Sequence, residues 1–342
     1  MTSSHSRSRR RRLARAAILA VPAAVGTVGA LATLARRDRR AIAADPVRPR
    51  LQAPTGGESR TVTAPDGTRL HVELFGPADA QPVVLLHGWT CALRFWAFQV
   101  PVLAERYRVI AVDLRGHGRS EAGHTRDHGV ETLAADLDAV LEATTGRGSR
   151  PVLVGHSMGA MTIVAWSGRH RGDVARRIAG AALLNTGVSG LADAVTVFPG
   201  PARLRAAVYA ASSRSALPTG PASPLTFRAV RRMALSRHAS SARVAFCEEM
   251  ILATKAPVRA GFGRGFQALD LDDALEHLDV PTLVVAAELD RLTPPVHARR
   301  MAEHLPRVQR LLVVPGSGHM APVEVPDTVN AALLELLEAV SD

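Results

Sequence analysis

The chain has little of the chemistry from which metal and cofactor sites are usually built. It contains only two cysteines, Cys91 and Cys247, among 342 residues. Two cysteines neither form a disulfide framework nor indicate a redox compartment, and we expect two buried free thiols. The thirteen histidines do not cluster with them, and no glycine-rich loop of the phosphate-binding type is present. The sequence therefore offers no motif for a metal ion or an organic cofactor.

Acidic residues are also scarce relative to basic ones, and the net charge is +11. Such an excess first suggests a nucleic acid or a membrane as partner. The excess is local, however, because residues 1–50 contain twelve arginines and two aspartates, whereas the rest has 30 basic and 29 acidic residues. A near-neutral body argues against a nucleic-acid partner. That body is long enough to bury a large core as a single domain.

Arginines stand on both sides of an uncharged run at residues 16–35. Twenty residues are about the length that crosses a bilayer, although this run is rich in alanine and glycine and contains Pro22. Three interpretations remain open: a single membrane anchor, a cleaved export signal, or a tail that leaves the protein cytoplasmic. We favour the anchor, within a basic segment of residues 1–45. Residues 46–59, with several prolines and glycines, then predict a linker.

A Gly-His-Ser-Met-Gly sequence at residues 155–159 is the most informative motif. It follows an apolar run at 150–154 that predicts a strand, and it precedes a run at 160–166 that predicts a buried helix. A sharp turn from strand to helix holds its central residue in a strained conformation with an exposed side chain. The two glycines leave room for that turn, because a Cβ atom would crowd the neighbouring elements. Ser157 is therefore predicted to be a nucleophile.

A nucleophilic serine needs a base and an acid that orients the base. Apolar runs at 281–287 and 309–314 predict two late strands. Asp290 follows the first, and His319 follows the second in a glycine-containing loop. The carboxyl ends of such strands are where open α/β sheets build their sites. We predict Asp290 as the acid and His319 as the base, with Glu288 as a rival carboxylate.

The fourth expected element stabilises negative charge on the substrate. A buried strand at 82–86 is followed by His87, Gly88 and Trp89. Its turn can aim the main-chain N–H of Trp89 at a developing oxyanion. The second donor would be the N–H of Met158, the residue after the nucleophile.

These motifs together resemble the α/β-hydrolase superfamily, in the branch of small esterases, cofactor-free haloperoxidase-like enzymes and carbon–carbon bond hydrolases. The resemblance covers about residues 60–340. It is carried by segments 87–89, 113–120, 155–159, Asp290, and 318–326 with its Gly-His and Glu-Val-Pro sequences. The family implies a mostly parallel, eight-stranded type of sheet flanked by helices, with no cofactor. It also implies an inserted helical lid, which we place at about 190–270. The 113–120 stretch is a structural loop in the family, so His117 and Arg115 receive no catalytic role.

The expected activity is hydrolysis of a small, largely apolar ester or related acyl substrate through an acyl-enzyme. Serine in place of the aspartate nucleophile of related dehalogenases argues for acyl transfer. With only Tyr107 and Tyr209 in the chain, the lid tyrosines that epoxide-opening relatives use are scarce. Carbon–carbon bond hydrolysis, or haloperoxidase-like perhydrolysis, would use the same triad. A catalytically inactive ligand receptor is the alternative of another class. The sequence does not indicate the oligomeric state.

Overall fold

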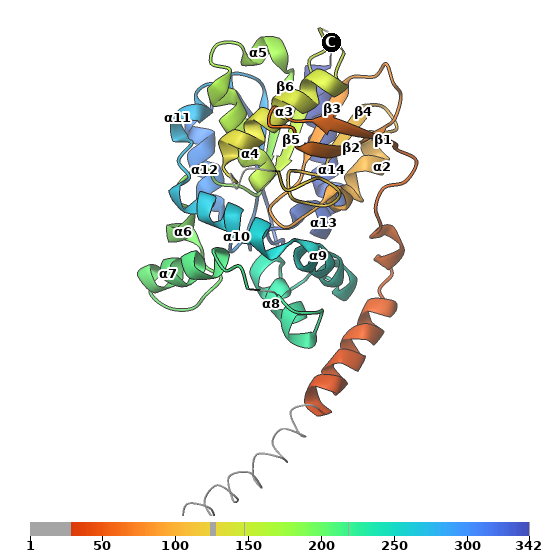
Figure 1. Ribbon diagram of the computed structural model, residues 1–342, viewed down its shortest axis with the longest axis vertical. Helices are drawn as coiled ribbons and strands as arrows, with labels where there is room; N and C mark the ends of the chain where they lie inside the picture. The colour runs from red at the N-terminus through yellow and green to blue at the C-terminus, as the bar shows by residue number, and fades with distance from the viewer. Residues whose placement is uncertain (1–28, 124–127, 147, 218, 342) are drawn as a thin grey trace, which may run out of the picture.

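One mixed sheet of eight strands runs through the domain (Figure 1). The computed structural model describes residues 29–123, 128–146, 148–217 and 219–341. The strands are β1 (Glu58–Thr63), β2 (Arg69–Phe75), β3 (Pro82–Leu86), β4 (Arg108–Val112), β5 (Val152–His156), β6 (Gly180–Leu184), β7 (Thr282–Ala287) and β8 (Val308–Val314). Their order in the sheet is β1-β2-β4-β3-β5-β6-β7-β8. Strands β3 to β8 are parallel, and the β1–β2 hairpin joins antiparallel to β4.

The central parallel strands β3, β5, β6 and β7 form where the sequence contains apolar runs without polar alternation. Every residue of β5, β6 and β7 is buried, as expected for a parallel sheet covered on both faces. The strands predicted at 82–86, 150–154, 281–287 and 309–314 are confirmed, with bounds that differ by at most two residues. The predicted α/β-hydrolase fold with a mostly parallel sheet is therefore correct.

Helices cover both faces of the sheet. They are α2 (Gln99–Leu103), α3 (Val130–Thr144), α4 (Met158–Arg169), α5 (Val174–Arg177), α11 (Asp272–Leu275), α12 (Pro295–His304), α13 (Ala321–Glu324) and α14 (Pro326–Val340), with the 3-10 turns η1 (Arg48–Arg50) and η2 (Leu93–Trp96). The buried side chains form one large cluster that includes α2 and α14 and another that includes α3, α4 and α12. The sheet thus separates two hydrophobic layers.

A helical insertion lies between β6 and β7. It contains α6 (Leu191–Ala194), α7 (Ala202–Ser213), α8 (Pro224–Ala234), α9 (Ser241–Ala253), α10 (Ala256–Gly265) and η3 (Phe266–Ala268). We call residues 191–270 the cap. In Figure 1 the cap lies at the lower end of the domain, past one end of the strands. Its position matches the segment at about 190–270 in which we expect a lid.

The chain before β1 contacts the cap. Residues 29–43 are helical, and the Asp38 carboxylate pairs with Arg228 of α8 at 2.8 Å. An Asp45 carboxylate oxygen accepts the main-chain N–H of Ala242 in α9 at 2.9 Å, and Leu51 is buried in the core. The expected linker at 46–59 is thus partly packed against the domain.

Most of the candidate membrane span at 16–35 falls on residues 1–28, outside the described residues. Among the residues that the structure does describe, no helix combines the length and apolar character that a membrane crossing needs.

Candidate active site

Ser157 stands at the turn between β5 and α4. Its backbone has φ 50° and ψ −115°, a strained conformation for a residue with a side chain. A Cβ atom on Gly155 would lie 2.4 Å from the main-chain N of Ala160, and one on Gly159 would lie 2.1 Å from the main-chain O of Leu86. Larger residues at these two positions would therefore open the turn. The structure has the strand–turn–helix geometry that the motif predicts.

The loops after β7 and β8 bring Asp290 and His319 together. Nδ1 of His319 lies 2.8 Å from Oδ2 of Asp290, and both side chains are buried. Burial raises the pKa of Asp290, but the adjacent His319 and main-chain donors outweigh it, and the net pKa is lowered. Asp290 is therefore a carboxylate at neutral pH and can hold the His319 ring with Nε2 free.

Two further side chains surround the Asp290 carboxylate, and the sequence analysis missed both. The Thr293 hydroxyl donates to Oδ2 of Asp290 at 2.9 Å, and the amide of Asn185 donates to the same oxygen at 3.2 Å. The main-chain N–H groups of Leu292 and Thr293 each donate to Oδ1 at 2.9 Å. Thr293 could have been noticed from its place three residues after Asp290. Asn185 lies 105 residues earlier, and no local pattern indicates it.

Glu288, the rival carboxylate, points elsewhere. Its Oε2 accepts the main-chain N–H of Gly316 at 2.8 Å at an exposed position. It thus binds the loop that leads to His319, and it forms no hydrogen bond or ion pair with the imidazole of that residue.

The two predicted oxyanion donors lie beside Ser157. Met158 is the first residue of α4. Within the described residues, the main-chain N–H groups of Trp89 and Met158 have no hydrogen-bond partner. A Cβ atom on Gly88 would come within 3.2 Å of Cβ of Ser157 and 2.6 Å of Nδ1 of His156. The loop after β3 therefore approaches the serine so closely that only glycine fits at position 88.

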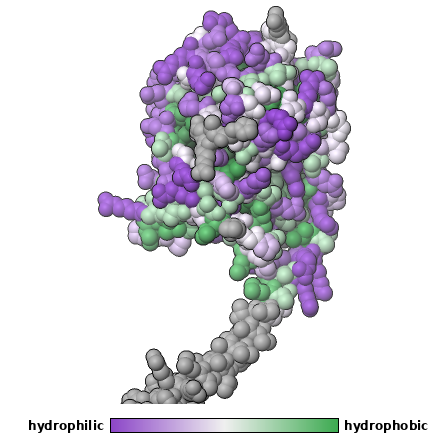
Figure 2. Space-filling view, viewed as in Figure 1, coloured by the Kyte–Doolittle hydropathy of each residue, from purple (hydrophilic) through white to green (hydrophobic). Residues whose placement is uncertain are grey.

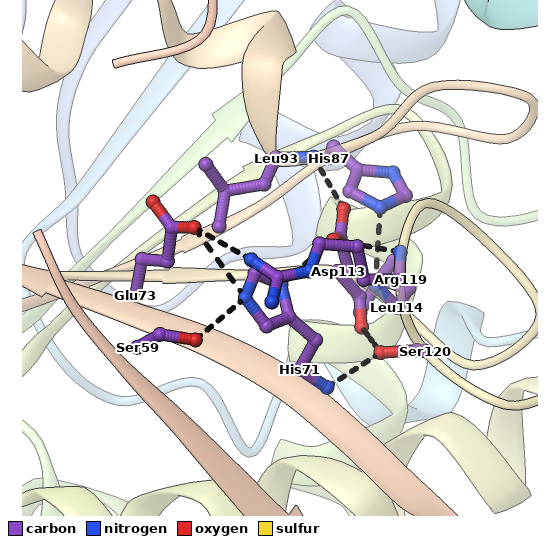
Figure 3. A network of polar contacts seen from close by, with 9 residues as sticks. All are labelled: Ser59, His71, Glu73, His87, Leu93, Asp113, Leu114, Arg119 and Ser120. Atoms are coloured by element: carbon purple, nitrogen blue, oxygen red, sulfur yellow. Dashed lines mark hydrogen bonds and ion pairs between the residues drawn. The ribbon is translucent and has the colours of Figure 1, made fainter. Parts of the chain in front are cut away.

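A buried polar network fixes that loop (Figure 3). One oxygen of Asp113 accepts the main-chain N–H of Leu93 at 2.6 Å, and the other lies 2.9 Å from Nδ1 of His71. Nε2 of His87 accepts the N–H of Leu114 at 3.0 Å. Burial is the largest influence on Asp113 and raises its pKa, but these partners lower it below its usual range. The segment after β4 therefore supports the loop after β3, which carries the predicted oxyanion donor Trp89.

His117 and Arg115 belong to this support, as the sequence analysis expects. Nε2 of His117 accepts the main-chain N–H of Thr90 at 3.1 Å, and burial lowers the pKa of His117 to about 3. Arg115 forms ion pairs with Asp66 and Asp136. Neither side chain lines the cavity beside Ser157.

Glu324 joins the His319 loop to the cap. Its Oε1 accepts the N–H of Gly318 at 3.0 Å, and its Oε2 accepts the N–H of Ser236 at 2.9 Å. Burial raises the pKa of Glu324 despite these two donors. The loop of the predicted base and the end of α8 thus share one carboxylate.

Ser157 and His319 open into one cavity of about 270 Å³. The Ser157 hydroxyl forms no hydrogen bond with any described residue. Most of the walls are apolar and come from the cap and the loops, and they include Trp89, Met161, Leu191, Val230, Ile251 and Phe266. Polar side chains contribute only a small part of the lining surface, and Arg259 is the only arginine among them. In the described part of the chain, no three His, Cys, Asp or Glu side chains are arranged to hold a metal ion.

The two cysteines are free and buried. Burial raises the pKa of Cys91 to about 12 and that of Cys247 well above the ordinary thiol value. The expected pair of buried free thiols is confirmed, and neither thiol is reactive at neutral pH.

Comparison with known proteins identifies the family of this chain. The model of the α/β-hydrolase fold family matches residues 81–326. A non-heme chloroperoxidase from Burkholderia pyrrocinia is 32% identical over 289 residues, which cover 81% of this chain and 99% of that protein. A bifunctional esterase/perhydrolase from Acinetobacter calcoaceticus is 28% identical over 292 residues, with 81% and 99% covered.

A solved structure supports the same conclusion. A thermophilic esterase from Thermogutta terrifontis superposes with a TM-score of 0.68 at 26% identity, and the match covers 83% of this chain and 100% of that one. The residues 81–326 that match the family model include both late-strand loops and the strand–turn–helix around Ser157. The chain therefore belongs to the α/β-hydrolase fold family and is an enzyme of the hydrolase class.

Proposed function

We propose that the protein is a serine hydrolase that cleaves a small, largely apolar ester through an acyl-enzyme. One observation carries this proposal: the strained Ser157 shares a cavity with His319, whose Nδ1 contacts the buried Asp290. Such a constellation activates a serine hydroxyl as a nucleophile. The apolar walls and the modest cavity volume favour a small acyl group over a polymer or a charged substrate.

The proposed reaction has two stages. The Ser157 oxygen attacks the ester carbonyl while Nε2 of His319 accepts the hydroxyl proton. The carbonyl oxygen becomes an oxyanion, and the N–H groups of Trp89 and Met158 stabilise it. Collapse of this intermediate releases the alcohol, which takes the proton from His319 and leaves an acyl group on Ser157. A water molecule, deprotonated by His319, then attacks the acyl carbonyl. The bond to the Ser157 oxygen breaks, His319 returns the proton to that oxygen, and the carboxylic acid is released.

Asp290 has two roles in this scheme. It fixes the His319 ring with Nε2 toward the substrate, and it stabilises the imidazolium that forms in each stage. Asn185 and Thr293 support it, because their donors hold the carboxylate in one orientation.

A fluorophosphonate probe tests the proposal, because only an activated serine reacts with it. We expect stoichiometric labelling of the wild-type protein and no labelling of Ser157→Ala. A panel of p-nitrophenyl esters of rising acyl length then defines the substrate range. Wild-type protein that reacts with neither reagent would instead be an inactive ligand receptor.

A second candidate reaction is cleavage of a carbon–carbon bond in a substrate that carries a carboxylate. Arg259 favours it, because this residue lines the cavity and its guanidinium forms no ion pair with any described residue. It donates only to the main-chain carbonyls of Ser215 and Leu217. A dienoate assayed beside the ester panel distinguishes the two reactions. Perhydrolysis would use the same triad, and hydrogen peroxide added to the ester assay tests it.

We also propose that residues 16–35 anchor the protein to a membrane as a single N-terminal span. The arginines on both sides and the length of the uncharged run support this placement. Removal of residues 1–37 would retain the contacts of Asp38 and Asp45 with the cap. This truncation should release the protein from the membrane fraction without changing kcat. Intact full-length protein in the soluble fraction would contradict the anchor, and a shortened mature form would indicate export.

A further inference from the structure

Helix α8 of the cap has an exposed face of mixed aliphatic and basic character. Leu225, Arg228, Ala229, Arg232 and Met233 are all exposed and follow the spacing of one helix face. Leu225 is 66% exposed and Met233 is 38% exposed. The opposite face of the helix, by contrast, is buried in the domain. An aliphatic stripe in solvent next to arginines is costly unless another surface covers it.

Helix α7 has a similar exposed stripe. Leu204 is 55% exposed and Val208 is 36% exposed, and the exposed Ala207 and Ala211 continue the same face. Of the seven large hydrophobic side chains that are exposed within the described residues, five belong to the cap. Figure 2 shows hydrophobic side chains gathered at the lower, cap end of the molecule, while its upper end is mainly hydrophilic.

The charge of the cap differs from that of the rest of the domain. Residues 191–270 contain eleven arginines and lysines and four acidic residues. The other residues of the 51–342 body contain nineteen basic and twenty-five acidic side chains. The near-neutral body is therefore polarised, with its positive charge concentrated on the cap. Such a surface attracts a polyanionic partner.

The active-site cavity opens on this same face. Ser212 of α7 and Ala229 and Met233 of α8 are exposed, and all three also line the cavity that contains Ser157. The N-terminal helix also leaves from here, because Asp38 pairs with Arg228. In Figure 1 this helix extends from the cap end, away from the sheet. The entrance of the cavity, the aliphatic stripes of α7 and α8 and the positive charge therefore all belong to the cap face.

We propose that the exposed faces of α7 and α8 dock on an anionic lipid bilayer, so that the cavity receives an ester dissolved in that bilayer. Short aliphatic side chains interspersed with arginines suit the interface between acyl chains and anionic headgroups. The delivery of an ester rests on the proposed function, whereas the docking does not. Docking of the cap is also separate from the anchor at residues 16–35, which could tether the domain in any orientation.

A fluorescent label on the cap tests the docking. The buried native thiols do not compete for a maleimide, so Leu225→Cys or Leu204→Cys of the full-length protein can carry a single environment-sensitive dye. Ala78→Cys is the control, because it lies in the turn before the amino end of β3, at the end of the sheet away from the cap. We expect roughly threefold brighter, blue-shifted emission at positions 225 and 204 with phosphatidylcholine–phosphatidylglycerol vesicles, and no change at position 78.

Vesicles of phosphatidylcholine alone should give a much weaker response. Protein that binds the anionic vesicles without any change at positions 225 and 204 would overturn the proposal, because only the N-terminal segment would then be attached. A response to polyglutamate but not to vesicles would overturn it as well, in favour of an acidic protein partner.

A pair of charge variants tests the delivery of the ester. Leu225→Asp with Arg232→Glu changes the cap face without touching the cavity lining. Ala78→Asp with Arg169→Glu makes the same charge change at the opposite end of the domain. On a short-acyl ester of a long-chain alcohol, which anionic vesicles carry in their bilayer, we expect the cap variant to be about tenfold slower than wild type and the control to be unchanged. Both should hydrolyse a water-soluble ester at the wild-type rate.

Equal rates of both variants on the vesicle-borne ester would overturn the delivery step. Wild-type protein that fails on the water-soluble ester would instead refute the proposed function, and the fluorescence experiment would still decide the docking.

Discussion

The carboxylate of Glu288 accepts the main-chain N–H of Gly316 at 2.8 Å, three residues before His319. The two acidic residues after β7, Glu288 and Asp290, thus have different contacts. Asp290 contacts the imidazole itself, and Glu288 contacts the loop that carries it. Although Glu288 and Asp290 lie two positions apart, we therefore expect their substitutions to have very different effects on kcat.

Asp290→Asn should lower kcat by at least about 10³-fold, because an amide cannot stabilise the imidazolium and favours the wrong ring tautomer. Glu288→Gln is the matched control, since its amide oxygen can still accept the N–H of Gly316, and its kcat should stay within about threefold of wild type. Steady-state kinetics on a soluble p-nitrophenyl ester measures both. A larger loss in the Glu288 variant would refute the choice of Asp290 as the acid.

Ser157→Ala should lower kcat by about 10³-fold or more, with some residual catalysis from the oxyanion donors. The fold should be retained, because the Ser157 side chain forms no hydrogen bond with a described residue. Kinetics should be accompanied by circular dichroism. A variant that keeps more than a tenth of the activity would exclude an acyl-enzyme on this serine.

Gly88→Ala should displace the oxyanion loop, because the new Cβ would lie 2.6 Å from Nδ1 of His156. Loss of one oxyanion donor costs about 10²- to 10³-fold in kcat, and we expect a loss in this range. Gly146→Ala is the control, since a Cβ there meets nothing within 4 Å. If KM rises while kcat is unchanged, the loop binds substrate without stabilising the transition state.

Acidification should destabilise the fold through its buried histidines. Burial lowers the pKa values of His117 and His156 to about 3, whereas histidines in an unfolded chain titrate near about 6.5. Between these values the unfolded chain binds more protons than the folded one. The contribution of the two histidines to the free energy of unfolding is therefore present above pH 6.5 and is lost as the pH falls toward 3. Each histidine contributes about 1.4 kcal/mol per pH unit over this window.

Urea unfolding at several pH values between 6 and 4.5 measures this slope. His117→Gln lies outside the cavity, and its amide can still accept the N–H of Thr90, so it should reduce the slope by about 1.4 kcal/mol per pH unit. Glu324 opposes the trend in the lower part of this window, because its pKa is raised. An unchanged slope in the variant would show that His117 is not the group that titrates.

Local sequence patterns predicted the parts of the site that depend on a strand and the residues that directly follow it. Ser157, Asp290 and His319 each follow an apolar run, which is buried in β5 and β7 and only partly buried in β8. Parallel strands bring their carboxyl ends together. The family resemblance supplied the lid between β6 and β7. Patterns of this kind do not indicate contacts between distant segments. Asn185 reaches Asp290 only because β6 and β7 are neighbours in the sheet.

The packing of the N-terminal region was also beyond the sequence patterns. Prolines and glycines at 46–59 predict a linker, but they do not show that Asp45 binds the start of α9 or that Leu51 is buried. The sequence also did not indicate that the apolar stripes of α7 and α8 are exposed, because the same spacing of apolar residues occurs on helix faces that are buried.

The carboxylate of Glu324 has a consequence for protein engineering. It receives one donor from the loop of His319 and one from Ser236, where α8 ends. A cap transplanted from another member of the family would bring its own helices but would have to reproduce this junction. If the main-chain N–H at the position of Ser236 were displaced, the chimera would leave a buried acceptor half satisfied beside His319. Grafts that retain residues 235–240 of this chain should therefore tolerate more foreign sequence elsewhere in the cap.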